Sequence, residues 1–308
     1  MNQNNRRETK DFFPVFLMGG LFVLIHSLAL LMVGPFEAAD MAAFENPDDP
    51  MNIVQFFLTL LLFTGAVLLI AKFWKKQLIQ GIILAAIGIS AFSMLYSLLA
   101  FAVSVEWSLL LSIAATAVLV LMLVRYPEWY VIDICGITIA VYAIAILGIS
   151  LSIFLVIALL IGLAIYDAIS VYKTKHMIDL ADTFLDLKLP VVVIIPKIRN
   201  YSLIKETKGL KEKLESEEER DAFFMGLGDF VMPGILVAST FHNIASNGLL
   251  IALSVIIGTL LGFAALIKAV STGKPQAGLP YLCSGAIAGY LVSSYILLGE
   301  LAGLTLFF

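Results

Sequence analysis

Residues 150–172 read SLSIFLVIALLIGLAIYDAISVY, and residues 222–241 read AFFMGLGDFVMPGILVASTF. Each stretch is as long and as apolar as a helix that crosses a bilayer, which needs roughly 20 mainly apolar residues. Each also contains a single charged residue, Asp167 in the first and Asp229 in the second. A carboxylate in the middle of a span costs about 2.5–3.5 kcal/mol on insertion scales, so it indicates a functional site.

Apolar segments of the same kind continue in both directions along the chain. Of the 308 residues, 61% are hydrophobic and only 14% are charged, whereas soluble domains have about 25% charged residues. The predicted spans are 12–34, 53–71, 79–103, 108–124, 130–147, 150–172, 222–241, 248–267 and 277–298. We therefore predict an all-α, polytopic membrane protein with about nine transmembrane helices. The first apolar run is longer than the core of a signal peptide, so we expect it to be retained.

The charged residues of the connections predict the orientation. The connection 35–52 has five acidic residues and no basic one, whereas the connection 173–221 has ten basic residues. With nine spans, all 19 Lys and Arg residues fall on one side, which the positive-inside rule makes the cytoplasm. We expect a multi-pass protein of the cell membrane with a cytoplasmic N-terminus and an extracellular C-terminus. The net charge of −4 argues against a nucleic-acid partner.

The chain then divides into three parts. Residues 1–172 hold the first six helices, residues 173–221 form a cytoplasmic loop, and residues 222–308 hold the last three helices. Within the loop, the charged stretch 205–220 is expected to be a solvated helix. The run 190–196 is β-branched and bracketed by prolines, and it is too short to span. It is expected to be either a strand or a segment at the membrane interface.

Asp167 and Asp229 are expected to form a pair. Their spans run in opposite directions, and each aspartate lies a few residues from the cytoplasmic end of its span, so the two carboxylates lie at similar depth. Two adjacent carboxylates cannot both ionise cheaply, so one holds a proton while the other acts as a base. Such a pair can activate water against a peptide carbonyl. Gly226 and Gly228 would allow another backbone to approach, and Pro233 would kink the helix.

These residues resemble the motifs of a known family. Tyr166-Asp167 and Gly226-Leu227-Gly228-Asp229 are similar to the YD and GxGD motifs of presenilins and signal peptide peptidases, and the continuation FVMPGIL is most like the latter. The family's third motif, Pro-Ala-Leu before a proline, corresponds to Ala277-Gly278-Leu279-Pro280, in which only Leu279 and Pro280 match. The order and spacing of these motifs cover most of the chain, and the compact loops are like those of a microbial, archaeal-type member.

The resemblance implies an intramembrane aspartyl endopeptidase that cuts single-span membrane proteins or peptides within the bilayer. Asp167 and Asp229 carry over as the catalytic pair. Tyr166, Gly226, Leu227 and Gly228 carry over as motif residues, and Leu279 with Pro280 as the element that shapes the site. No cofactor or metal is expected, and the compact chain favours a lone enzyme or a homo-oligomer without accessory subunits. The run 190–196 is also a candidate for pairing with an unwound substrate.

Two other function classes remain open from the residues alone. Intramembrane aspartates also serve ion-coupled transporters and cation channels, although no repeat between the halves supports a transporter. A structural or chaperone-like protein would leave two costly aspartates unexplained. The sequence has no H-E-x-x-H motif and no Gly-x-Ser-x-Gly motif.

The remaining polar and thiol groups of the spans are expected to be structural. We expect His26 to be a polar contact between helices, and Asp133 with Glu128 to be interfacial charges. Cys135 and Cys283 lie in apolar stretches and form neither a disulfide framework nor a metal site.

Overall fold

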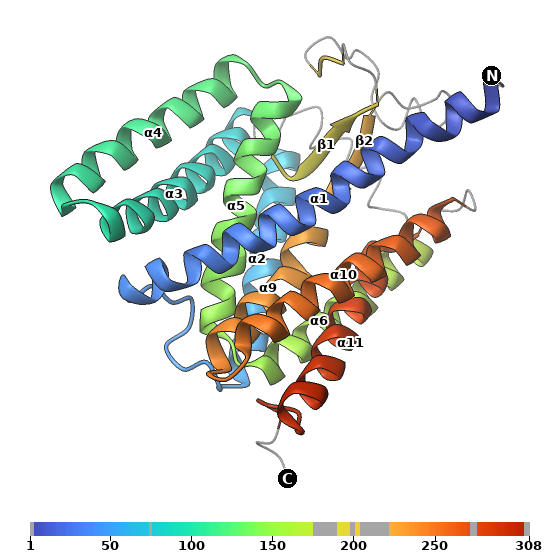
Figure 1. Cartoon of the computed structure of the whole chain (residues 1–308). Coiled ribbons are helices and arrows are strands. Elements are labelled where there is room, and N and C mark those ends of the chain that lie inside the picture. The colour runs from blue at the N-terminus through green and yellow to red at the C-terminus, as the bar shows by residue number, and fades with distance from the viewer. Residues whose placement is uncertain are drawn as a thin grey trace.

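The computed structural model describes residues 3–73, 76–174, 190–197, 201–203, 222–271 and 276–304. Nine α-helices and one two-stranded sheet lie within these ranges (Figure 1). The helices are α1 (Gln3–Ala38), α2 (Met51–Phe73), α3 (Lys76–Ala102), α4 (Val105–Arg125), α5 (Trp129–Ser150), α6 (Ile153–Ile169), α9 (Leu227–Asn243), α10 (Gly248–Val270) and α11 (Gly278–Leu298). The strands are β1 (Val192–Pro196) and β2 (Ala222–Gly226).

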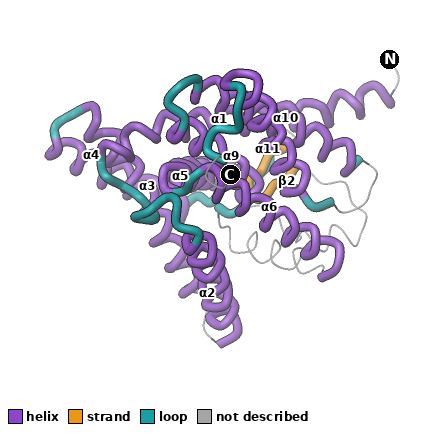
Figure 2. The backbone as a smooth tube through the Cα atoms, turned by 90° about the horizontal axis from the view of Figure 1, so that it is seen from below, coloured by secondary structure: helices purple, strands orange, loops and turns teal. Residues whose placement is uncertain are grey.

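The helices match the nine predicted spans one to one. Seven of those in the described residues are long and apolar enough to cross a membrane. The other two are α2, of which the part Met51–Leu62 is an apolar helix among the residues whose side chains are described, and α9, which has 17 residues and is about 25 Å long. Figure 2 shows α2 projecting away from the other helices.

At two boundaries the type of secondary structure differs from the prediction. Residues 222–226 are a strand and not the first turn of the seventh helix, because their backbone groups pair with β1. The sixth helix ends in a single π-helical turn, Ser170–Thr174, rather than continuing as α-helix. Of the two expectations for 190–196, the strand is correct. The expected charged helix 205–220 lies outside the described residues.

α9 is the central helix of the bundle. It contacts α1, α5, α6, α10 and α11, and eleven of its residues are buried. Its Phe230 packs against Phe22 of α1, with ring centroids 4.2 Å apart. Because α9 is enclosed on several sides, its N-terminal turn has a fixed position relative to its neighbours.

α10 and α11 form the most extensive helix contact, and glycines make it possible. A Cβ placed on Gly262 would overlap the backbone of Tyr281, and one on Gly289 would lie 2.5 Å from the carbonyl oxygen of Ser254. Helices pack this closely in membranes where small residues repeat every four positions. The pair therefore approaches backbone to backbone and fixes where α11 begins.

The sheet lies beside the cytoplasmic end of α5, by the predicted orientation. β1 and β2 are antiparallel, with Ile194 opposite Phe224 and Val192 opposite Gly226. β1 contacts α5, and β2 continues directly into α9 (Figure 1). The sheet thus joins the helix that follows it to a helix from the first half of the chain.

Candidate active site

Asp167 lies in the last turn of α6 and is buried. Its Oδ2 accepts a hydrogen bond from the backbone N–H of Leu279, with an N···O distance of 3.1 Å. The Gly278 amide also bonds to this carboxylate. Both donors belong to the first turn of α11, whose first N–H groups have no partner within the helix. The start of α11 therefore binds Asp167 through its backbone.

Asp229 is the third residue of α9. The helix begins immediately after β2, so the sheet determines where this turn lies. The carboxylate lies against Gly278, where an added Cβ would be 3.1 Å from Oδ1 and 3.3 Å from Oδ2. Gly278 is therefore the residue between the two aspartates: its amide faces Asp167 and its Cα faces Asp229. The two carboxylates are close enough to interact electrostatically.

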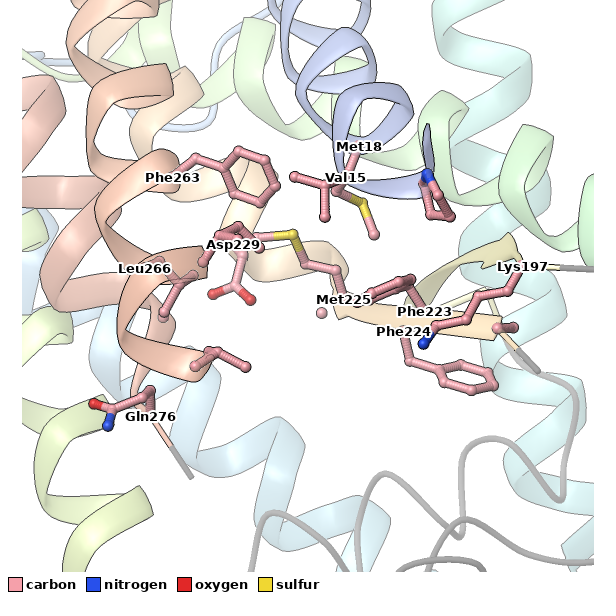
Figure 3. A pocket seen from close by; sticks show the side chains of 16 residues that line it. Val15, Met18, Lys197, Phe223, Phe224, Met225, Asp229, Phe263, Leu266 and Gln276 are labelled. Atoms are coloured by element: carbon pink, nitrogen blue, oxygen red, sulfur yellow. The ribbon is translucent and has the colours of Figure 1, made fainter. Parts of the chain in front are cut away.

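A cavity of about 340 Å³ opens beside Asp229. Figure 3 shows the Asp229 carboxylate pointing into it, with the side chains of Phe263 and Leu266 from α10 close by. β2 forms another wall, and residues 14, 15 and 18 of α1 a third. Most of the lining is apolar, and Asp229 is the acidic group among the lining residues. An apolar polypeptide segment could therefore fit in the cavity and lie in contact with the Asp229 carboxylate.

A second contact joins α6 to the start of α11. Tyr172 lies in the π-helical turn, and its hydroxyl donates a hydrogen bond to Oε1 of Gln276, at an O···O distance of 3.0 Å. Gln276 also lines the cavity. The start of α11 is thus joined to α6 and its π-helical turn by two contacts, one at Asp167 and one at Tyr172.

Comparison with known proteins identifies this arrangement. The family described as signal-peptide peptidase, presenilin aspartyl protease matches residues 19–298. This chain belongs to that family. Two crystal structures of a presenilin family intramembrane aspartate protease are also similar to it. The form in space group C222 is 31% identical, with a TM-score of 0.70 over 92% of this chain and 99% of that one. The P2 form is 32% identical, with a TM-score of 0.66 over 92% and 98%.

A search of curated proteins gave no match. The family and its solved members nevertheless confirm a multi-pass membrane protein that is an intramembrane aspartyl protease and hydrolyses peptide bonds. They give no support to a transporter.

The other motif residues of this presenilin-family protease have different surroundings. Tyr166 is 63% exposed on the outer side of α6 and does not share the burial of Asp167. Leu227 is buried, and its Cδ1 would be 3.5 Å from a Cβ on Gly136 of α5. Gly228 has open space around it, whereas a Cβ on Gly226 would be 3.6 Å from Oδ2 of Asp229. Of these residues, Gly226 is the one that borders a carboxylate.

Two acidic residues, one in α5 and one at its N-cap, have roles that the sequence did not predict. Asp133 is 8% exposed and accepts a hydrogen bond from the N–H of Ile194 in β1, at 2.8 Å. Glu128 accepts hydrogen bonds from Ser202 and Leu203. Both residues hold the segment that contains β1, a role that the expectation of interfacial charges did not include. The sequence did offer one signal of this role: Asp133 lies inside an apolar span with no basic residue at the same depth, which indicates a specific partner for the carboxylate.

The expectation for His26 is consistent with the structure. Its side chain is fully buried, and Nε2 lies 3.0 Å from the carbonyl oxygen of Phe230. Because a carbonyl oxygen can only accept, Nε2 carries the proton. The residue next to Asp229 is therefore bound by a side chain of α1.

Proposed function

We propose that Asp167 and Asp229 are the catalytic pair and that they hydrolyse peptide bonds within transmembrane segments of single-span proteins. One observation carries the assignment. The two carboxylates come from adjacent antiparallel helices and lie on either side of Gly278, and both Gly278 and Asp229 line an apolar cavity. A carboxylate pair that shares a site can divide the roles of acid and base.

The hydrogen bonds favour a specific division of roles. Asp167 accepts backbone N–H groups, which stabilise its ionised form. A carboxylate has about four lone-pair sites, so it can still accept a proton from water. Asp229 has no hydrogen-bond donor among the described residues. We therefore assign Asp167 as the base and Asp229 as the acid.

The reaction then follows from these roles. Asp167 removes a proton from water, and the hydroxide oxygen attacks the carbonyl carbon of the scissile bond. Asp229 gives its proton to the carbonyl oxygen, which forms a neutral tetrahedral intermediate. Collapse of the intermediate breaks the C–N bond, with a proton returned to the leaving amine. No step of this reaction requires a metal or a cofactor.

The departure from the third family motif does not weaken this assignment. The contacts with Asp167 are made by the backbone amides of Gly278 and Leu279, so they do not require the proline and alanine side chains that the family motif has at 277 and 278. Pro280 lies in the first turn of α11, where its missing N–H has no helical partner to lose. We propose that Leu279 shapes the site through its amide, which binds Asp167, and that Pro280 does so by starting α11 at this point.

The edge of β2 is the candidate docking site for the substrate. The N–H of Ile194 is directed to Asp133, away from β2. In an antiparallel pair, its partner Phe224 then directs its own N–H and carbonyl away from β1. This edge belongs to a strand that lines the cavity. An unwound substrate would satisfy its backbone groups there by adding a strand. The docking element is therefore β2 rather than residues 190–196.

We further propose the orientation that the charges predict. The N-terminus and the connection 173–221 are cytoplasmic, and the two helical parts, 1–172 and 222–308, together form the enzyme in the cell membrane. Substrates then enter with their amino termini outside. The chain acts alone or as a homo-oligomer, without an obligatory accessory subunit.

The test is cleavage of a single-span reporter by purified protein in liposomes. Asp167→Asn and Asp229→Asn should each lower the rate by at least about 10²-fold, the size of a general acid–base contribution. The folded state is checked by thermal unfolding of each variant. Cleavage that survives in either folded variant would show that the two residues are not the catalytic pair.

A further inference from the structure

Asp133 is a buried carboxylate that the proposed reaction does not use. It lies in the second turn of α5, a helix long and apolar enough to span the membrane. Its Oδ1 accepts the N–H of Ile194 at 2.8 Å. A carboxylate buried in such a helix is costly, and its bond to a strand residue 61 positions away indicates what it contributes.

This bond occupies one edge of the sheet. Alternate residues of an antiparallel strand direct their N–H groups to opposite sides. Ile194 directs its N–H outward, to Asp133, so a further strand cannot take that donor. The opposite edge, on β2, remains beside the cavity. Asp133 therefore makes the two edges of the sheet unequal.

α5 holds the strand segment at two more points. Glu128, which precedes α5, accepts hydrogen bonds from the Ser202 hydroxyl at 2.6 Å and the Leu203 amide at 3.0 Å. Gly136 lies one turn beyond Asp133, and a Cβ there would be 3.5 Å from the carbonyl oxygen of Pro190. The contacts lie before β1, at its middle and in the segment that follows it, so the strand has one position on α5.

The position of β1 determines the position of Asp229. The register pairs β1 with β2 residue by residue, and the N–H of Leu227 donates to the Val191 carbonyl at 2.9 Å. Leu227 is the first residue of α9 and Asp229 is the third. A shift of β1 along α5 would therefore move both the open edge of β2 and the carboxylate beside it.

We propose that Asp133 is a positioning residue that determines which peptide bond of the substrate is cut. By fixing β1 on α5, it fixes where a substrate strand on β2 lies relative to the aspartates. The inference rests on the proposed docking of the substrate at β2, and it adds a residue that lies outside the cavity. Without this bond, β1 has an unpaired N–H and the sheet can occupy more than one position.

The first test compares Asp133→Leu with Asp133→Asn on the same reporter, with product termini read by mass spectrometry. Leucine cannot accept the Ile194 N–H, so we expect at least a fivefold rise in the ratio of minor to major cleavage positions. We also expect kcat to fall more than KM changes. Asparagine keeps a carbonyl oxygen that accepts the N–H, so its cleavage positions should match those of the wild type.

A second variant removes the same bond from its other side. Ile194→Pro deletes the N–H donor at a strand position whose N–H faces away from the partner strand, which is where proline is tolerated. It should shift the cleavage positions as Asp133→Leu does. In the Ile194→Pro background, Asp133→Leu should add no further shift, because the two changes remove one interaction. If Asp133→Leu does not fold, Ile194→Pro decides the question.

Gly289→Ala is the control for lost stability alone. It overpacks α10 against α11, where the Cβ would be 2.5 Å from the Ser254 carbonyl oxygen, and it touches neither the sheet nor the cavity lining. Its cleavage positions should not change. Unchanged positions in folded Asp133→Leu or Ile194→Pro, or an equal shift in Gly289→Ala, would overturn the inference. A wild-type protein that cuts nothing would instead overturn the proposed function.

Discussion

At the scale of single residues, Gly278 has the most constrained position. Its amide serves one aspartate, and its Cα lies against the other. The sequence predicted that Asp167 and Asp229 share a depth, because both lie near one end of antiparallel spans. It did not predict that Gly278 lies between them. That contact joins residues about 50 and 110 positions apart, and it depends on where α11 begins.

We predict that the loss of kcat/KM on substitution of Gly278 increases with the size of the new side chain. An alanine Cβ would meet the end of the Asp229 side chain at 3.1–3.3 Å, and that carboxylate can move by a few tenths of an ångström. Gly278→Ala should therefore keep kcat/KM within about tenfold, or about 1.4 kcal/mol in the barrier. Gly278→Val adds two further methyl groups beside the Asp229 carboxylate and should lower kcat/KM by about 10²-fold, or about 2.7 kcal/mol in the barrier. Equal activity of the two variants in the reporter assay would contradict this placement.

His26 gives a second prediction at this scale. Its Nε2–H bonds to the Phe230 carbonyl, next to Asp229. A glutamine amide reaches about as far as Nε2, whereas an asparagine amide is one carbon shorter. His26→Gln should keep near wild-type kcat, and His26→Asn should lower kcat about tenfold and the free energy of unfolding by about 1 kcal/mol. The measurements are reporter kinetics and thermal unfolding. Equal kcat for the two variants would show that the bond does not position the turn.

At the scale of elements, hydropathy predicted the helices but not the sheet. Residues 222–226 are as apolar as the span they precede, so the sequence offered no boundary between strand and helix. Their partner strand lies about 30 positions earlier, and only the fold brings the two together. The strand at 190–196 was foreseen as one of two alternatives because it is short and β-branched. Its attachment to α5 through Asp133 was not foreseen.

The contact between α10 and α11 gives a prediction with a matched control. A Cβ on Gly285 would lie 3.0 Å from the Gly262 nitrogen and would overlap the Gly258 carbonyl. Gly285→Ala should lower the free energy of unfolding by about 1–3 kcal/mol. Gly81 on α3 has nothing within 4 Å. Gly81→Ala should be neutral or raise stability by up to about 1 kcal/mol, because alanine is the better helix former. Thermal unfolding in detergent compares them, and equal losses would contradict the close contact.

At the scale of the whole molecule, the orientation is a prediction from charge alone. Glu45 and Ser271 are both exposed and lie in connections predicted to face opposite sides. The natural cysteines, Cys135 and Cys283, are buried, so labelling of an introduced thiol can be distinguished from labelling of the natural ones. In intact cells, a membrane-impermeant maleimide should label Glu45→Cys and should label Ser271→Cys only after permeabilisation. The reverse pattern would invert the proposed topology and the direction of the substrates.

The backbone contact between α10 and α11 also bears on how a substrate leaves the lipid. Two helices that meet without intervening side chains cannot slide or part without losing the contact along its whole length, so they move as one rigid body. α6 meets α11 less extensively, and at the end that holds the aspartates the hydrogen bonds between α6 with its π-helical turn and the start of α11 run from Leu279 to Asp167 and from Tyr172 to Gln276. Separation of α6 from α11 would therefore open a lateral path to the aspartates at the cost of these two ties, and the same displacement would free the Asp167 carboxylate for water.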